Sequence, residues 1–256
     1  MSATLAILIG FSALLPQDEF TKELAQVDHL LQTKDSYAAV EYIQSQSTPG
    51  RVMTLYTAAT IHFLHKKKDM KAFVRLSQAG IQYELTMAGL TKDPKQAAVY
   101  RAQAKTLAYD LAANVWQGWG PGTFAATKEQ QRVGLDAARL DLRLAIELDK
   151  PAIKLAYAWW MLAATQMGLG DYTAARKGFE AAAAAARKAR NEIFELSARG
   201  FLGVTAILAG QTKEGQAAVD EAKTALAAFA KKGDEDAAFL ASQFDHALAA
   251  WRPKRK

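Results

Sequence analysis

Two histidines have the best spacing for metal chemistry in this sequence. His62 and His65 are three residues apart within a predicted helix, so both imidazoles can lean toward one ion. A third ligand is missing from the same turn, because Lys66–Lys68 follows and three ammonium groups oppose a cation. We therefore expect two histidines on a surface or in a groove, and we predict no metal site and no cofactor.

Trp119–Gly122 is the second stretch to consider, since a glycine-rich loop can hold a phosphate. Such loops follow a strand and lead directly into a helix, and a P-loop adds Lys and Ser or Thr. Here a helix is expected before the loop, and the Lys-Ser/Thr pair is missing. Two interpretations stay open for the irregular stretch 117–126. One is a turn that Trp116, Trp119 or Phe124 pins to the helices, which we favour, and the other is a loop that contacts a partner.

The carboxylates lack the pattern of an acid–base pair. Asp136 and Asp141, like Glu214 and Glu221, alternate with Lys or Arg within predicted helices, which is typical of solvated faces. The sequence contains no HExxH motif and no combination of an activated Ser with His and Asp. We therefore predict that the protein is not an enzyme, and we name no catalytic residue.

The composition indicates a globular helical chain. Of the 256 residues, 50% are hydrophobic and 23% are charged, six are proline and none is cysteine. Long runs of Ala, Leu, Lys, Glu and Gln favour helices, while alternating runs of Val, Ile and Thr are missing. The lack of cysteine excludes disulfides, zinc fingers and thiol catalysis. The net charge of +6 permits an anionic partner.

Helix signals divide the chain into eleven predicted helices. The first runs from Asp18 to Gln32 and the last from Asp236 to Trp251, and apolar residues recur in each with helical spacing. Residues whose side chains can accept a hydrogen bond from a first-turn amide precede several of these patterns. The predicted caps are Thr48, Thr127, Asp171, Asn191 and Thr212.

The stretch Tyr157–Ala186 holds two of these helices around a Gly-Asp break. One stripe of the first helix contains a tryptophan, and an Ala-x3-Phe stripe follows in the second. The same pattern returns at a fixed offset of forty residues, which predicts a repeated helical hairpin. Leu162 and Ala163 correspond to Leu202 and Gly203, Gly170 to Gly210, and Ala175, Phe179 and Ala182 to Gly215, Val219 and Ala222.

This pattern of Trp159, then Leu with a small residue, and later Ala-x3-Phe resembles the tetratricopeptide repeat. The resemblance covers Leu155–Ala228 and is weaker over Arg51–Pro151. The chain departs from the family where Ala163 replaces a glycine and Gln166 replaces a tyrosine. The resemblance implies an all-α fold, a right-handed α-solenoid of about five helical hairpins plus a C-terminal capping helix. We expect a single repeat domain over residues 17–251.

The resemblance also implies that the first helix of each hairpin lines a concave groove. Tyr157, Trp160, Ala164 and Met167 form a second apolar stripe beside that of Trp159. We interpret Trp159 as a core residue and Trp160 as the main contact for a partner. The alternative is that the superhelix closes, or that the N-terminal apolar segment folds in, and buries this stripe. The predicted partner-binding residues are Tyr157, Trp160, Met167, Val204, Ile207, Tyr109, Lys105 and His62.

The sequence therefore predicts a non-enzymatic scaffold or adaptor that binds a peptide or helical segment of a protein, alone or within a larger assembly. The alternative is a basic solenoid that binds nucleic acid or an anionic surface through His65–Arg75 and the basic tail Arg252–Lys256. We favour the protein partner, because nucleic-acid binders usually add stacking aromatics or an established fold to a basic stripe. Trp251 lies beside the tail, but we expect it to pack the last helix.

Residues 1–16 begin with an apolar run that carries no charged side chain. The run is shorter than the roughly 20 residues that span a bilayer, so we predict no stable membrane span. It is either a secretory signal with Leu5–Phe11 as its apolar core or a helix that covers the end of the stack. The missing basic residues count against a signal. We favour export, with a periplasmic location, over a cytoplasmic one.

Overall fold

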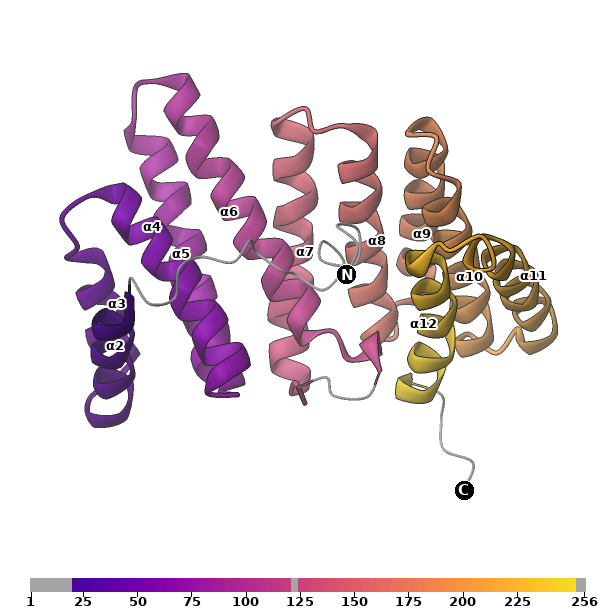
Figure 1. Cartoon of the computed structure of the whole chain (residues 1–256), viewed down its shortest axis with the longest axis horizontal. Coiled ribbons are helices and arrows are strands. Elements are labelled where there is room, and N and C mark those ends of the chain that lie inside the picture. Colours follow the sequence, from indigo (N-terminus) through magenta and orange to yellow (C-terminus); the bar gives the residue numbers. More distant parts are fainter. Residues whose placement is uncertain (1–19, 121–123, 252–256) are drawn as a thin grey trace. The chain divides into compact units, whose positions relative to one another are not determined.

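A computed structural model describes residues 20–120 and 124–251. They contain eleven α-helices and no strand, which confirms the predicted all-α class (Figure 1). They divide into two compact units, one of residues 20–111 and one of the described residues from 112 to 251. The predicted single domain and its right-handed superhelix stay predictions. Residues 1–16 and the tail Arg252–Lys256 lie outside the described residues.

The helices of the unit of residues 20–111 pack around one core. α2 packs against α3 and α4, and both α3 and α4 pack against α5. Val27, Ile43 and Leu55 are fully buried at the centre of this core. The helices are α2 (Thr21–Thr33), α3 (Ser36–Gln44), α4 (Pro49–Ile61) with the π-helical turn η2 (His62–Lys66), α5 (Met70–Leu90) and most of α6 (Pro94–Val115).

In the unit of residues 112–251, each helix packs against the next along the chain. The last helix, α12, also packs against α10 and against the short turn η3. The elements are η3 (Gln117–Trp119), α7 (Lys128–Glu147), α8 (Ala152–Gly168), α9 (Tyr172–Lys188), α10 (Glu192–Leu208), α11 (Thr212–Ala230) and α12 (Glu235–Trp251). No helix among the described residues is both long and apolar enough to cross a membrane.

The helix starts follow the capping signals of the sequence. Thr48, Asp171 and Asn191 each accept a hydrogen bond from a backbone amide three residues ahead. Thr127 forms the predicted capping box with Gln130. The prediction for Thr212 is wrong, because this residue is the first of α11 and the capping position, Gln211, makes no side-chain bond.

The two hairpins α8–α9 and α10–α11 share the predicted offset of forty residues. Gly170 and Gly210 follow α8 and α10 with φ angles of 87° and 93°, a left-handed conformation that favours glycine. In the second hairpin the helices approach closely, since a Cβ on Gly203 would lie 2.7 Å from the carbonyl oxygen of Gly215. Both repeats therefore use glycine where the chain turns.

Candidate functional site

An aromatic cluster forms the centre of the unit of residues 112–251. Trp160 of α8 is 1% exposed, and its ring centroid lies 4.9 Å from that of Phe201 and 5.3 Å from that of Trp116. Trp119 stacks on Trp160 at 5.6 Å. Such contacts add to the stabilisation that burial provides. The aromatic cluster comprises Trp116, Trp119, Trp160, Phe179, Phe201, Phe244 and Trp251.

Helix α12 packs onto the aromatic cluster through two large side chains that lie over glycines. Phe244 covers Gly200 of α10, where a Cβ would lie 2.1 Å from the phenyl ring. Trp251 covers Gly168 of α8, where a Cβ would lie 2.9 Å from the indole ring. A side chain at either position would collide with α12. We call this surface of α8 and α10 the α8–α10 face.

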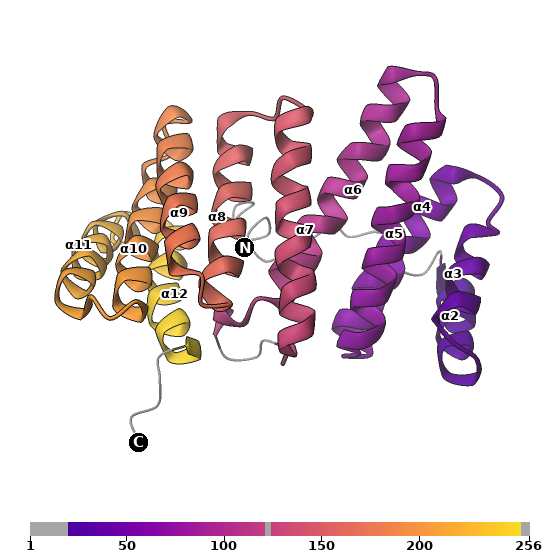
Figure 2. The same ribbon diagram turned by 180° about the vertical axis from the view of Figure 1, so that it is seen from behind.

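Helix α12 runs along the α8–α10 face in the same direction as α8. At its start, the Asp236 carboxylate lies near Tyr157, where burial, with this charge as a second cause, raises the pKa of the phenol. At its end, Trp251 contacts Gly168, the last residue of α8. Figure 1 shows α12 in front of α10, whereas in Figure 2, seen from behind, α9 lies in front of α12.

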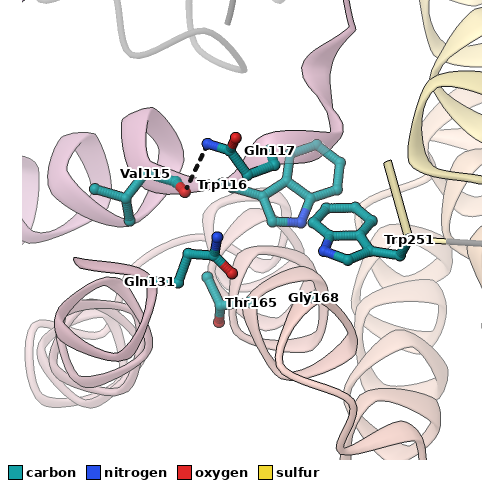
Figure 3. Close-up of a pocket in the computed structure, with 7 residues that line it drawn as sticks. All are labelled: Val115, Trp116, Gln117, Gln131, Thr165, Gly168 and Trp251. Carbon is teal, nitrogen blue, oxygen red and sulfur yellow. Dashed lines mark hydrogen bonds between the residues drawn. The ribbon is translucent and has the colours of Figure 1, made fainter. Parts of the chain in front are cut away.

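The C-terminal end of this interface is almost completely filled. A cavity of about 10 Å³ remains between Trp116, Trp251 and the last turns of α8, enough for about one water molecule (Figure 3). Gln117 donates a 3.5 Å hydrogen bond to the carbonyl oxygen of Val115 beside it. The other lining residues are Gln131, Thr165 and Gly168.

Six of the eight predicted partner-binding residues are buried by other parts of the chain. Lys105 and His62 are partly exposed, and they lie in the unit of residues 20–111. Binding of a partner by these eight residues stays a prediction. Six of them are buried within the chain, and over α8 and α10 the covering element is α12, which neither form of the alternative named. The six buried residues are Tyr157, Trp160, Met167, Val204, Ile207 and Tyr109.

The burial of the two adjacent tryptophans of α8 is the reverse of what the sequence pattern predicts. Trp160 is the largest fully buried side chain among the described residues, whereas Trp159 is partly exposed. The reason is that the stripe of Trp160 faces the aromatic cluster and α12, whereas the stripe of Trp159 is less completely covered. α7 and α9 also pack against α8.

The turn after α6 is held by its tryptophans, as the favoured interpretation of 117–126 predicts. Trp116 Nε1 donates to the carbonyl oxygen of Ala164 at 3.0 Å, and Trp119 Nε1 donates to that of Ala113 at 2.7 Å. Both indoles therefore have a satisfied N–H group, and Trp116 is also buried. Residues 121–123, which include part of the glycine-rich stretch, lie outside the described residues.

One of the four carboxylates expected on solvated faces is buried. Asp136 is exposed and pairs with Arg139 at 2.9 Å, and Glu214 and Glu221 are also exposed. Asp141, by contrast, is 0% exposed, so the prediction for it is wrong. Its position on the inner side of α7, beside buried residues at helical spacing, decides its burial. Within the described part of the chain, no group of three or more His, Asp or Glu side chains could hold a metal ion.

The covering of the α8–α10 face by α12 is the feature that the sequence interpretation missed. A signal for it exists, since α12 has its own apolar stripe with large side chains at Phe244 and Trp251. The stripe predicts that α12 packs against other helices, but it does not identify which ones. Comparison of the sequence with protein-family models and with curated proteins gives no match.

Proposed function

We propose that the protein is a non-enzymatic scaffold or adaptor that binds a helical segment of a partner protein on the α8–α10 face. The observation that supports this proposal is the packing of α12, whose Phe244 and Trp251 lie over Gly200 and Gly168. A helix placed on an apolar surface between other helices is a common mode of protein recognition. In this proposal a partner helix takes the place of α12.

We further propose that the hairpins are tetratricopeptide-like units. Their support is the repeated hairpin, in which Gly170 and Gly210 have the same conformation forty residues apart. The family period is about 34 residues, so these units are longer by one to two helical turns. In the family, the first helix of each hairpin lines the binding surface. α8 and α10 hold that position here, and they are the helices that receive Trp251 and Phe244.

Exchange of α12 for a partner helix requires α12 to leave its place. The connection between α11 and α12 is short and exposed at Lys231–Gly233, and Gly233 has a φ angle of 92°. Because α12 is tethered, it competes with a partner at an effective concentration on the order of 1 mM. A partner therefore binds more tightly to a chain whose α12 is loosened than to the wild-type chain.

A labelled peptide of residues 235–251 tests this proposal directly. In the full chain, Phe244→Ala removes one anchor of α12 and leaves the α8–α10 face unchanged. We expect saturable binding of the wild-type peptide to this variant, measured by fluorescence anisotropy, and at least about tenfold weaker binding to the wild-type chain. The physical reason is that the peptide restores the missing phenyl ring over Gly200.

Two controls separate helix recognition from unspecific apolar adhesion. A peptide that itself carries Phe244→Ala is expected to lose binding. The chain variant Phe239→Ala removes an equal side chain from a partly exposed position of α12 and is expected to behave like the wild type. The proposal fails if the Phe244→Ala chain keeps its far-UV circular dichroism and still does not bind the wild-type peptide.

A second candidate, binding to nucleic acid or an anionic surface, is favoured by exposed basic residues after α4. Lys66–Lys68, Lys71 and Arg75 are all exposed. This candidate predicts retention on heparin that decreases steeply with salt and decreases further in a Lys68→Gln/Lys71→Gln variant. If the two substitutions leave the retention on heparin unchanged, the surface around Lys68 and Lys71 is not the binding site.

A further inference from the structure

A cavity of about 240 Å³ opens between α2 and the π-helical turn η2, within the unit of residues 20–111. α2 contributes one helical stripe at positions i, i+3, i+4 and i+7, and Leu24 supplies its buried apolar part. The facing wall consists of basic side chains. The lining residues are Thr21, Leu24, Ala25 and Asp28 from α2, with His62, Lys66 and Lys67 opposite them.

The π-helical turn is what gathers these basic side chains. The amide of Lys67 donates to the carbonyl oxygen of His62 at 3.1 Å, a bond between residues five apart. This bond widens the turn, so that His62, Lys66 and Lys67 all line the same cavity. In a regular α-helix, residues five apart point to different sides. Single π-helical turns are rare and often occur at functional sites.

The charges at the cavity favour an anion. Lys67 Nζ lies 2.5 Å from Asp28 Oδ2, and this pair uses one of the three ammonium hydrogens. With the exposed Lys66, the formal charge of these three groups is +1. Burial, followed by the nearby Lys67 and Lys66, lowers the pKa of His62, so its neutral ring keeps one N–H donor at pH 7. Asp28 repels an anion, but it also holds Lys67 at the cavity.

We propose that this cavity binds a small oxyanion, preferably the phosphate group of a small molecule, through Lys66, Lys67 and an N–H group of His62. Lysine is a common phosphate ligand because its compact charge carries several donors. The apolar wall at Leu24 contacts the rest of the ligand. This site lies in a different unit from the α8–α10 face and does not depend on the proposed helix binding.

Titration of the full chain with inorganic phosphate, followed by NMR of the histidine ring signals, tests this proposal. Sodium chloride at the same ionic strength is the reference, and His29, His65 and His246 serve as internal controls. We expect a saturable shift of the His62 signals with phosphate only. Addition of a phosphate monoester, glycerol 3-phosphate, is expected to give the same shift with equal or higher affinity.

Matched variants distinguish a site from diffuse positive charge. Lys66→Gln is expected to weaken phosphate binding about fivefold, whereas Lys68→Gln, which removes the same charge outside the cavity, is expected to change it less than twofold. Ala25→Phe fills the cavity without a charge change and is expected to abolish binding. Equal weakening by both lysine variants, or a His62 shift with chloride as large as with phosphate, would overturn the proposal.

Discussion

The buried carboxyl group of Glu84 makes the stability of the unit of residues 20–111 depend on pH. Glu84 of α5 is 1% exposed, and neither of its oxygens has a hydrogen-bond partner among the described residues. Burial raises its pKa from an ordinary value of 4.5 to about 8. The folded chain therefore keeps a proton that the unfolded chain releases between these two values.

The sign and size of the effect follow from this difference in bound protons. As the pH rises from about 4.5 to 8, the unfolded state is favoured by about 1.4 kcal/mol per pH unit. Between pH 5 and 7 this corresponds to a loss of roughly 3 kcal/mol in the free energy of unfolding. Above pH 8 both states are ionised, and the loss stops. His62 and His65, whose pKa values burial lowers, contribute in the opposite direction between their folded values and 6.5.

The substitution Glu84→Gln isolates the contribution of this carboxyl group. It keeps the shape of the neutral acid and removes the titration, so its stability relative to the wild type is expected to rise with pH. Urea unfolding at pH 5, 6, 7 and 8 measures the difference. The exposed Glu41→Gln on α3 is the matched control, and it is expected to keep the wild-type slope.

The distribution of aromatic residues allows the effect to be assigned to one unit. All five tryptophans lie between positions 116 and 251, so their fluorescence reports the other unit only. Far-UV circular dichroism reports both. If the units unfold separately, Glu84→Gln shifts the circular dichroism transition and leaves the tryptophan transition unchanged. Parallel pH curves for the wild type and Glu84→Gln would refute the reasoning, because they would show that the folded state does not hold the extra proton.

Five further substitutions, grouped in three comparisons, test the packing and the helix starts by urea unfolding. Trp160→Ala is expected to cost about 3–5 kcal/mol, and Trp159→Ala less, because the second side chain is partly exposed; equal losses would contradict the observed burial. Gly200→Ala is expected to destabilise by about 1–3 kcal/mol although alanine favours helices, and Phe244→Ala should relieve the clash in the double variant. Thr127→Ala removes the capping box and is expected to cost about 1 kcal/mol, seen in the tryptophan transition.

The helices were predictable because the signals that start and end them are local. Thr48, Thr127 and Asn191 each bond to an amide only three residues ahead, so a short stretch of sequence contains both partners. Thr212 shows the limit of this reasoning. A residue that can cap is also compatible with the first helical position, and the structure places it there.

The candidate site was less predictable because burial there depends on contacts that are distant in sequence. Trp159 and Trp160 both lie on apolar stripes, and the pattern alone does not show which stripe α12 covers. Asp141 and Glu84 illustrate the same point for charged residues. The residues next to them in sequence do not mark either position as buried. The packing of other helices against α5 and α7 is what buries these carboxyl groups.

Gly168 and Gly200 indicate that the position of α12 is encoded in α8 and α10 as well as in α12 itself. Gly200 lies in the interior of α10, where glycine costs about 1 kcal/mol relative to alanine. Alanine would suit either helix alone, but its Cβ would collide with Trp251 at position 168 and with Phe244 at position 200. The two anchors are seven residues apart and therefore lie on one side of a helix. The proposed function therefore requires that a partner helix replacing α12 present two large apolar side chains at this same spacing, and a peptide series with shifted anchors tests this requirement.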